Sequence, residues 1–140
     1  MKTALIAGAT GLIGSQLLTL LLADDHYKQV KVLSRKPLAL SHPKLIIIET
    51  DFNNLADKQQ VLTADDVFCC LGTTMKKAGS KEAFKKVDYD YPLALAKTTH
   101  AQGATQYLLV SALGASAKSS IYYNQMKGMI EDAVSAVGFT

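Results

Sequence analysis

Short apolar runs of strand length alternate along the chain with longer segments of helical length. The apolar runs predict strands at residues 3–7, 30–34, 45–49, 67–71 and 107–110. The longer segments predict helices at residues 12–23, 54–62, 81–102 and 121–137, the third of them kinked at Pro92. The run at 45–49 is continuously apolar, as is typical of a strand buried on both faces. This alternation predicts the α/β class, a three-layer sandwich whose parallel sheet has the order 3-2-1-4-5 and whose ligand crevice lies at the carboxyl ends of the strands.

A glycine-rich turn connects the first expected strand to the first helix. Gly8, Gly11 and Gly14 form the pattern G-x-x-G-x-x-G between two apolar runs. Glycines permit a tight turn, a close approach of the backbone to a pyrophosphate and close packing of helix on strand, while the helix N-terminus attracts phosphate. A P-loop is excluded because no Lys precedes Ser15, and glycines interrupt the apolar run of a signal peptide. The alternatives are a strand–helix turn without a ligand and a dinucleotide site; the context favours the latter, with contacts from Gly8, Thr10, Gly11, Leu12, Ile13 and Gly14.

The end of the second expected strand bears on the choice of cofactor. An NAD site normally has Asp or Glu here, hydrogen-bonded to the ribose 2′-OH, whereas this chain has Ser34, Arg35 and Lys36. Arg35 can bind a 2′-phosphate bidentately, Lys36 adds positive charge, and Ser34 can donate a hydrogen bond. The alternative is a solvated basic loop before Pro37. We expect NADP, as NADPH, with NAD the less favoured cofactor.

Two further strand ends are expected to contact the cofactor. Asp51 can accept a hydrogen bond from the adenine amino group, with Phe52 lining the base, or it can cap the following helix. After the fourth strand come Leu71, Gly72 and Thr73. Gly72 leaves room for the cofactor ribose and Thr73 can hydrogen-bond to it.

A candidate catalytic set lies near the end of the chain. Tyr123 and Lys127 form a Y-x-x-x-K pattern, which places phenol and ammonium one helical turn apart on one face. Tyr123 can exchange a proton with a carbonyl or alcohol oxygen, Lys127 can stabilise the phenolate and hold the nicotinamide ribose, and Ser111 at the end of the fifth strand can polarise the substrate. The alternative is a surface pair of no catalytic importance. Together with the glycine turn, the set favours catalysis.

Composition narrows the class of protein. The chain has 140 residues, 49% hydrophobic and 19% charged, with a net charge of +3, which suits one domain and gives no reason to expect nucleic acid as a partner. No apolar run reaches membrane-spanning length, and no metal-ligand spacing is present. Cys69 and Cys70 are adjacent, so a disulfide between them is not expected and both are interpreted as small core residues. These features predict a reduced, cytoplasmic protein.

Several segments together resemble a known family. They are Gly8 to Gly14, Cys70 to Thr74 with Lys77 to Gly79, Val87 to Tyr91, Ser111 with Gly114 and Ala115, and Tyr123 to Gly128 followed by Glu131. The chain resembles the short-chain dehydrogenase/reductase superfamily, in its atypical NAD(P)-binding group, and within it the oxidoreductase-like branch that includes the HIV-Tat-interactive protein. The resemblance implies a Rossmann-type fold, NADPH binding, and the superfamily's catalytic roles for Ser111, Tyr123 and Lys127.

The chain departs from that family in two ways. Asp88 stands near the place where many members have an Asn, and relatives continue into a sixth strand and a segment that builds the substrate pocket. We therefore expect residues 1–140 to be the N-terminal NAD(P)-binding domain of a longer chain, ending before strand 6. Two functions are expected: NADP(H)-dependent hydride transfer to or from a small carbonyl or alcohol, or NADP(H) binding by a regulatory or redox-sensing protein that acts on a protein partner without turnover.

Overall fold

The computed structural model describes residues 2–72, 75–110 and 122–139. Five parallel strands make one sheet in the order β3-β2-β1-β4-β5, as predicted. In chain order the elements are β1 (Lys2–Ala7), α1 (Leu12–Ala23), β2 (Tyr27–Ser34), β3 (Leu45–Glu49), the 3₁₀ helix η1 (Phe52–Val61), β4 (Asp66–Cys69), α2 (Met75–Ala78), α3 (Lys81–Lys85), the π-helical segment η2 (Lys86–Asp90), α4 (Tyr91–Ala101), β5 (Gln106–Leu109) and α5 (Tyr122–Ser135).

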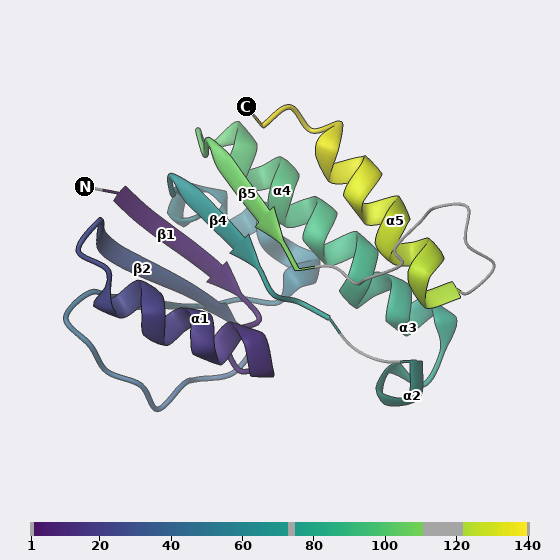
Figure 1. Cartoon of the computed structure of the whole chain (residues 1–140), viewed down its shortest axis with the longest axis horizontal. Helices are drawn as coiled ribbons and strands as arrows, with labels where there is room; N and C mark the ends of the chain where they lie inside the picture. The colour runs from purple at the N-terminus through teal and green to yellow at the C-terminus, as the bar shows by residue number, and fades with distance from the viewer. Residues whose placement is uncertain (1, 73–74, 111–121, 140) are drawn as a thin grey trace.

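The sheet is covered on both faces, which gives the three layers expected (Figure 1). β1 lies at its centre, and residues 4–7 of this strand are fully buried. Because side chains alternate along a strand, Ala4 and Ile6 join the cluster that packs against α1, while Leu5 and Ala7 join the cluster formed with η1 and α4. The central strand therefore holds both halves of the core together.

The third strand differs from the prediction. β3 is an edge strand, and Ile46 is 38% exposed, so the expectation of a strand buried on both faces is wrong. Next to it on β2, the ammonium of Lys31 donates to the carbonyl oxygens of Val61 and Thr63, at 3.0 and 2.7 Å, where η1 ends. Burial lowers the pKa of Lys31. A lysine of β2 thus binds the carbonyl groups at and just beyond the end of η1.

The predicted helix at 81–102 is continuous, but its irregularity precedes Pro92. The backbone N–H of Tyr91 donates to the carbonyl of Lys86, five residues earlier, which widens the helix at η2. Proline has no N–H, and its ring clashes with the carbonyl four residues before it. We attribute the wider turn to this clash, since one extra residue in the turn moves the obstructed carbonyl aside.

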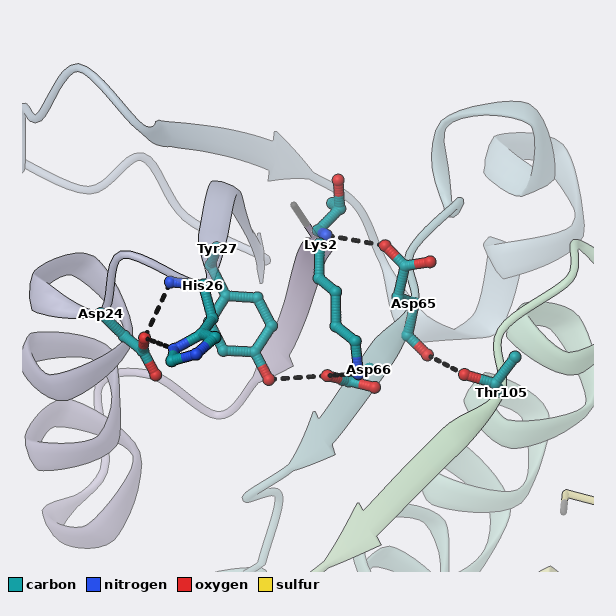
Figure 2. A network of polar contacts seen from close by, with 8 residues as sticks. Lys2, Asp24, His26, Tyr27, Asp65, Asp66 and Thr105 are labelled. Carbon is teal, nitrogen blue, oxygen red and sulfur yellow. Dashed lines mark hydrogen bonds and ion pairs between the residues drawn. The ribbon is translucent and has the colours of Figure 1, made fainter.

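A polar network ties the amino ends of the strands together (Figure 2). The hydroxyl of Tyr27 donates to Asp66 Oδ2 at 2.7 Å, and Lys2 Nζ lies 3.6 Å from the same oxygen. Asp66 is 3% exposed, and its Oδ1 has no hydrogen-bond partner within the described ranges. Burial, together with the hydrogen bond to Asp66, raises the pKa of Tyr27 well above its usual value. Tyr27 is therefore a neutral donor to a buried carboxylate.

The Tyr27→Phe variant tests the contribution of this hydrogen bond. Removing the donor leaves the Asp66 carboxylate less satisfied in the core, so we expect the free energy of unfolding to fall by about 1–3 kcal/mol at neutral pH. Urea titration measures the change. Tyr122→Phe is the matched control, because the Tyr122 hydroxyl makes only a long, exposed contact of 3.5 Å with the carbonyl of Lys81. Equal stability of the two variants would contradict the prediction.

Candidate functional site

The glycine turn is closed so tightly that side chains are excluded from it. Gly8 has a φ of +84°, and a Cβ placed there would lie 2.5 Å from the carbonyl oxygen of Cys70 at the end of β4. A Cβ on Gly14 would lie 1.9 Å from the carbonyl oxygen of Gly8. Both distances are far below van der Waals contact, so the first turn of α1 rests directly on the backbone of the turn. The packing thus supports the tight turn expected at Gly8 and the close helix contact expected at Gly14, while their contact with a pyrophosphate stays a prediction.

The start of α1 is suited to an anion. Gly11 occupies the N-cap position, no side chain caps the helix, and its first turn contains no acidic residue. The first backbone N–H groups of a helix have no partner within it and carry the positive end of its dipole. Leu12 and Ile13 lie at this end with their side chains exposed, at 80% and 54%. A phosphate placed here meets backbone donors and no negative charge from the helix.

A cleft of about 450 Å³ opens beside this turn at the carboxyl ends of the central strands. This is the place where the strand order reverses between β1 and β4, and where ligands bind in open α/β sheets. It is lined by residues from four strand ends: Gly8, Ala9, Thr10, Val32, Leu33, Ser34, Arg35, Lys36, Pro37, Leu38, Phe52 and Leu71. Segments predicted separately from the sequence therefore converge on one site.

The basic residues after β2 lie at this cleft. Arg35 and Lys36 are exposed, and within the part of the chain that the structure describes neither forms an ion pair. The hydroxyl of Ser34 donates to the carbonyl of Lys36 at 2.6 Å and accepts from its N–H at 3.2 Å. Ser34 thus holds the loop in shape, and the two cations remain available to a ligand.

The structure shows one of the two expected roles for Asp51. Its carboxylate accepts a hydrogen bond from the N–H of Asn53 at 3.0 Å and caps η1. Contact with adenine stays a prediction. Phe52 is buried, lines the cleft and stacks on Tyr91 with ring centroids 5.4 Å apart. Phe52 therefore forms part of the cleft wall, while its contact with the adenine stays a prediction.

The Y-x-x-x-K pair lies on α5, and its lysine is buried. Lys127 is 5% exposed, and its ammonium donates to Asp88 Oδ1, a carboxylate that is itself 1% exposed. The ring centroid of Tyr123 lies 5.4 Å from Lys127 Nζ, and the ring packs against Phe84 at 5.5 Å. The alternative of a surface pair is thus wrong for Lys127, although nothing in this arrangement tests catalysis.

Gly72 connects the ion pair to the cleft. A Cβ on Gly72 would lie 3.6 Å from Lys127 Nζ and 3.7 Å from Asp88 Oδ1, while its neighbour Leu71 lines the cleft. Of two consecutive residues after β4, Leu71 therefore lines the cleft and Gly72 lies beside the ion pair of Lys127 and Asp88. The partnership of Lys127 with Asp88 is the feature that sequence reasoning missed; the only signal for it was an acidic residue at an otherwise apolar helical position.

Four further residues were singled out in the sequence: Ser111, Thr73, Cys69 and Cys70. Ser111 and Thr73 lie outside the described residues, so their roles stay predictions. Cys69 and Cys70 are free thiols, as expected, and burial raises the pKa of Cys69 to about 11. Along the described ranges, none of the helices combines the length and apolar character needed to span a bilayer.

Comparison with known proteins decides the family. A family model described as NAD(P)H-binding matches residues 8–137. The chain belongs to this NAD(P)H-binding family. It is similar to Protein FMP52, mitochondrial, of Candida albicans, with 37% identity over 96% of this chain and 61% of the relative. It is also similar to Protein HTATIP2 of Rattus norvegicus, with 34% identity over 99% of this chain and 58% of the relative.

Solved structures agree on the fold of this NAD(P)H-binding chain. MoeE5 in complex with UDP-glucose and NAD has a TM-score of 0.79 at 19% identity, over 96% of this chain and 48% of that one. The Bordetella bronchiseptica enzyme WbmH in complex with NAD⁺ also has a TM-score of 0.79, at 18% identity, over 99% and 54%. Together with the family match, they identify an atypical short-chain-dehydrogenase-like protein with a Rossmann-type fold. The chain thus spans about half to three fifths of the proteins it matches.

The expected location is corrected by these relatives. We predicted a cytoplasmic protein, whereas the FMP52 relatives of several fungi are named mitochondrial. The prediction rested on free cysteines and on composition. Free cysteines are typical of reducing conditions and this composition is typical of a chain that folds in water, but neither feature identifies the cellular compartment.

The paired variants Gly14→Ala and Gly11→Ala test the closed turn. A methyl at Gly14 must push α1 away from Gly8, so we expect a loss of about 1–3 kcal/mol in the free energy of unfolding. A methyl at Gly11 meets the carbonyl oxygen of Gly8 at 3.6 Å, an ordinary contact, and should change stability by less than about 1 kcal/mol. Thermal and urea unfolding measure both. A Gly14→Ala variant as stable as Gly11→Ala would show that α1 does not rest on the turn.

Proposed function

We propose that this protein binds NADP(H) and transfers hydride between it and a small carbonyl or alcohol substrate. The supporting observation is that the glycine turn, Arg35, Lys36 and Phe52 line one cleft. The buried Lys127 lies beside Gly72, the residue that follows Leu71 on the cleft wall. The turn has no side chains at the place where a pyrophosphate would approach the protein backbone, which fits a dinucleotide. That the substrate of the whole protein is a small carbonyl or alcohol is part of this proposal.

The charge at the end of β2 supports NADP(H) over NAD(H). A carboxylate at this position would repel a 2′-phosphate, whereas Arg35 offers a planar pair of donors and Lys36 a second cation. Both lie on the cleft wall, with Pro37 and Leu38 continuing it. The pyrophosphate would meet the N-terminus of α1, and the adenine would lie between this loop and Phe52.

The residues on α5 would then handle the proton. The bound cofactor supplies or accepts the hydride. In reduction, Tyr123 donates its phenolic proton to the carbonyl oxygen as negative charge develops there, and in oxidation it accepts the alcohol proton. Lys127 stabilises the phenolate and holds the nicotinamide ribose, and Ser111 polarises the substrate carbonyl.

One observation favours a second function. Lys127 shares its positive charge with a buried carboxylate, which offsets the field that would stabilise a Tyr123 phenolate. A protein that binds NADP(H) and responds through a partner, without turnover, has no need of that field. The two functions differ in whether bound NADPH is consumed.

Cofactor choice is tested with the Arg35→Ala variant. Losing a charge-assisted bidentate contact should weaken NADPH binding about ten- to a hundredfold and leave NADH binding nearly unchanged. Calorimetric titration of both cofactors measures this. Lys28→Ala is the matched control, since it removes an exposed positive charge at the other end of β2. Equal losses for NADPH and NADH would contradict a role of Arg35 at the 2′-phosphate.

Turnover is tested with the Tyr123→Phe variant and its neighbour Tyr122→Phe. With a panel of small aldehydes and ketones, the wild-type protein should consume NADPH, and Tyr123→Phe should reduce kcat by about 10²–10⁴-fold while NADPH affinity stays within about threefold. Tyr122→Phe should retain wild-type kcat. Tight NADPH binding without consumption of any panel compound would favour the regulatory function. Equal kcat for both variants would exclude Tyr123 as the acid.

A further inference from the structure

The ion pair between Asp88 and Lys127 is costly to bury. Asp88 is 1% and Lys127 is 5% exposed, and they come from segments 39 residues apart in the chain. Removing two charges from water costs several kcal/mol for each ion, and apolar residues of similar volume are often as stabilising or more so. Folding alone therefore gives little reason for a charged pair here.

The backbone places Asp88 in this position through an irregular turn. Phe84, Asp88 and Pro92 follow one another at four-residue intervals, and all three are buried. Phe84 and Asp88 contact α5, and Asp88 lies within the wider turn of η2 that precedes Pro92. π-helical turns inside α-helices are frequent at functional sites. The acidic side chain thus stands in an apolar row, where it forms a buried ion pair with Lys127.

The chain that follows β4 runs beside the pair at Gly72, next to Leu71 on the cleft wall. Gly72 has no side chain to cover the pair, and the two charged atoms lie 3.6 and 3.7 Å from where a Cβ would be. An ammonium has three N–H donors, and the bond to Asp88 uses one. Lys127 can therefore serve Asp88 and a hydroxyl of a ligand at the same time.

We propose that Asp88 is a positioning residue that holds the Lys127 ammonium beside Gly72 for donation to the nicotinamide ribose hydroxyls of NADP(H). The inference rests on the proposed function. Without Asp88, the flexible four-carbon side chain of Lys127 loses the carboxylate that holds its ammonium in place. Asp88 thus acts on the cofactor through Lys127 and does not touch it.

A double-mutant cycle in the whole protein tests this with NADPH as the titrant. Asp88→Asn should weaken NADPH binding about tenfold, and Lys127→Met should weaken it at least as much. In the Lys127→Met background, Asp88→Asn should cause no further loss. Asp90→Asn is the matched control, because it removes a carboxylate two residues away whose pair with Lys85 is about half exposed. Calorimetry gives the affinities, and circular dichroism verifies that each variant is folded.

A second variant keeps the test decisive if Asp88→Asn does not fold. Gly72→Ala sets a methyl at ordinary contact distance against both charged atoms, so it should fold normally and weaken NADPH binding about tenfold. Wild-type affinity in a folded Asp88→Asn or Gly72→Ala protein would overturn the inference. A loss from Asp88→Asn that persists beside Lys127→Met would also overturn it. A wild-type protein that binds no NADPH would instead overturn the proposed function, and the inference with it.

Discussion

The cleft depends on a steric constraint at Gly8. Its positive φ and the carbonyl of Cys70, 2.5 Å from where a Cβ would lie, require a glycine there. Gly14 transmits the same constraint to α1, whose first turn rests on the carbonyl of Gly8. The end of β1, the start of α1 and the end of β4 are thus fixed relative to one another by backbone contact. A helix N-terminus held this rigidly has its donors in place before a ligand arrives, so less ordering opposes binding.

Much of this arrangement was predictable because it is local in sequence. The strand order followed from alternating strands and helices, and the cleft followed from the glycines and from Ser34, Arg35 and Lys36 at a strand end. The burial of β3 was predicted wrongly, because its sequence shows only that the strand is apolar, whereas its burial depends on which elements cover it. Ile46 lies on this edge strand and is left partly exposed. The predicted strand order already placed this strand at the edge, but how far its two faces are covered is a tertiary property.

The partner of Lys127 could not be predicted either, because the contact is also a tertiary property. The sequence places Tyr123 and Lys127 one turn apart, since a helix fixes that spacing, but Asp88 comes from a segment 39 residues earlier. Asp88 lies within the wide turn at η2, which we attribute to Pro92. The kink was expected at the proline itself. The backbone adjusts one turn before it, which is where the acidic residue lies.

The sheet separates two buried carboxylates with different surroundings. Asp66 lies at the amino end of β4 and Gly72 follows the carboxyl end of the same strand, where it adjoins Asp88. Asp66 is held by a neutral donor, Tyr27, and by a lysine that is half exposed, so its charge is balanced partly by solvent. Asp88 instead faces a buried ammonium. A full charge pair stabilises a fold poorly but orients an ammonium well, because the low local dielectric strengthens the attraction. The fully buried pair is found near the end of the strand where the cleft opens.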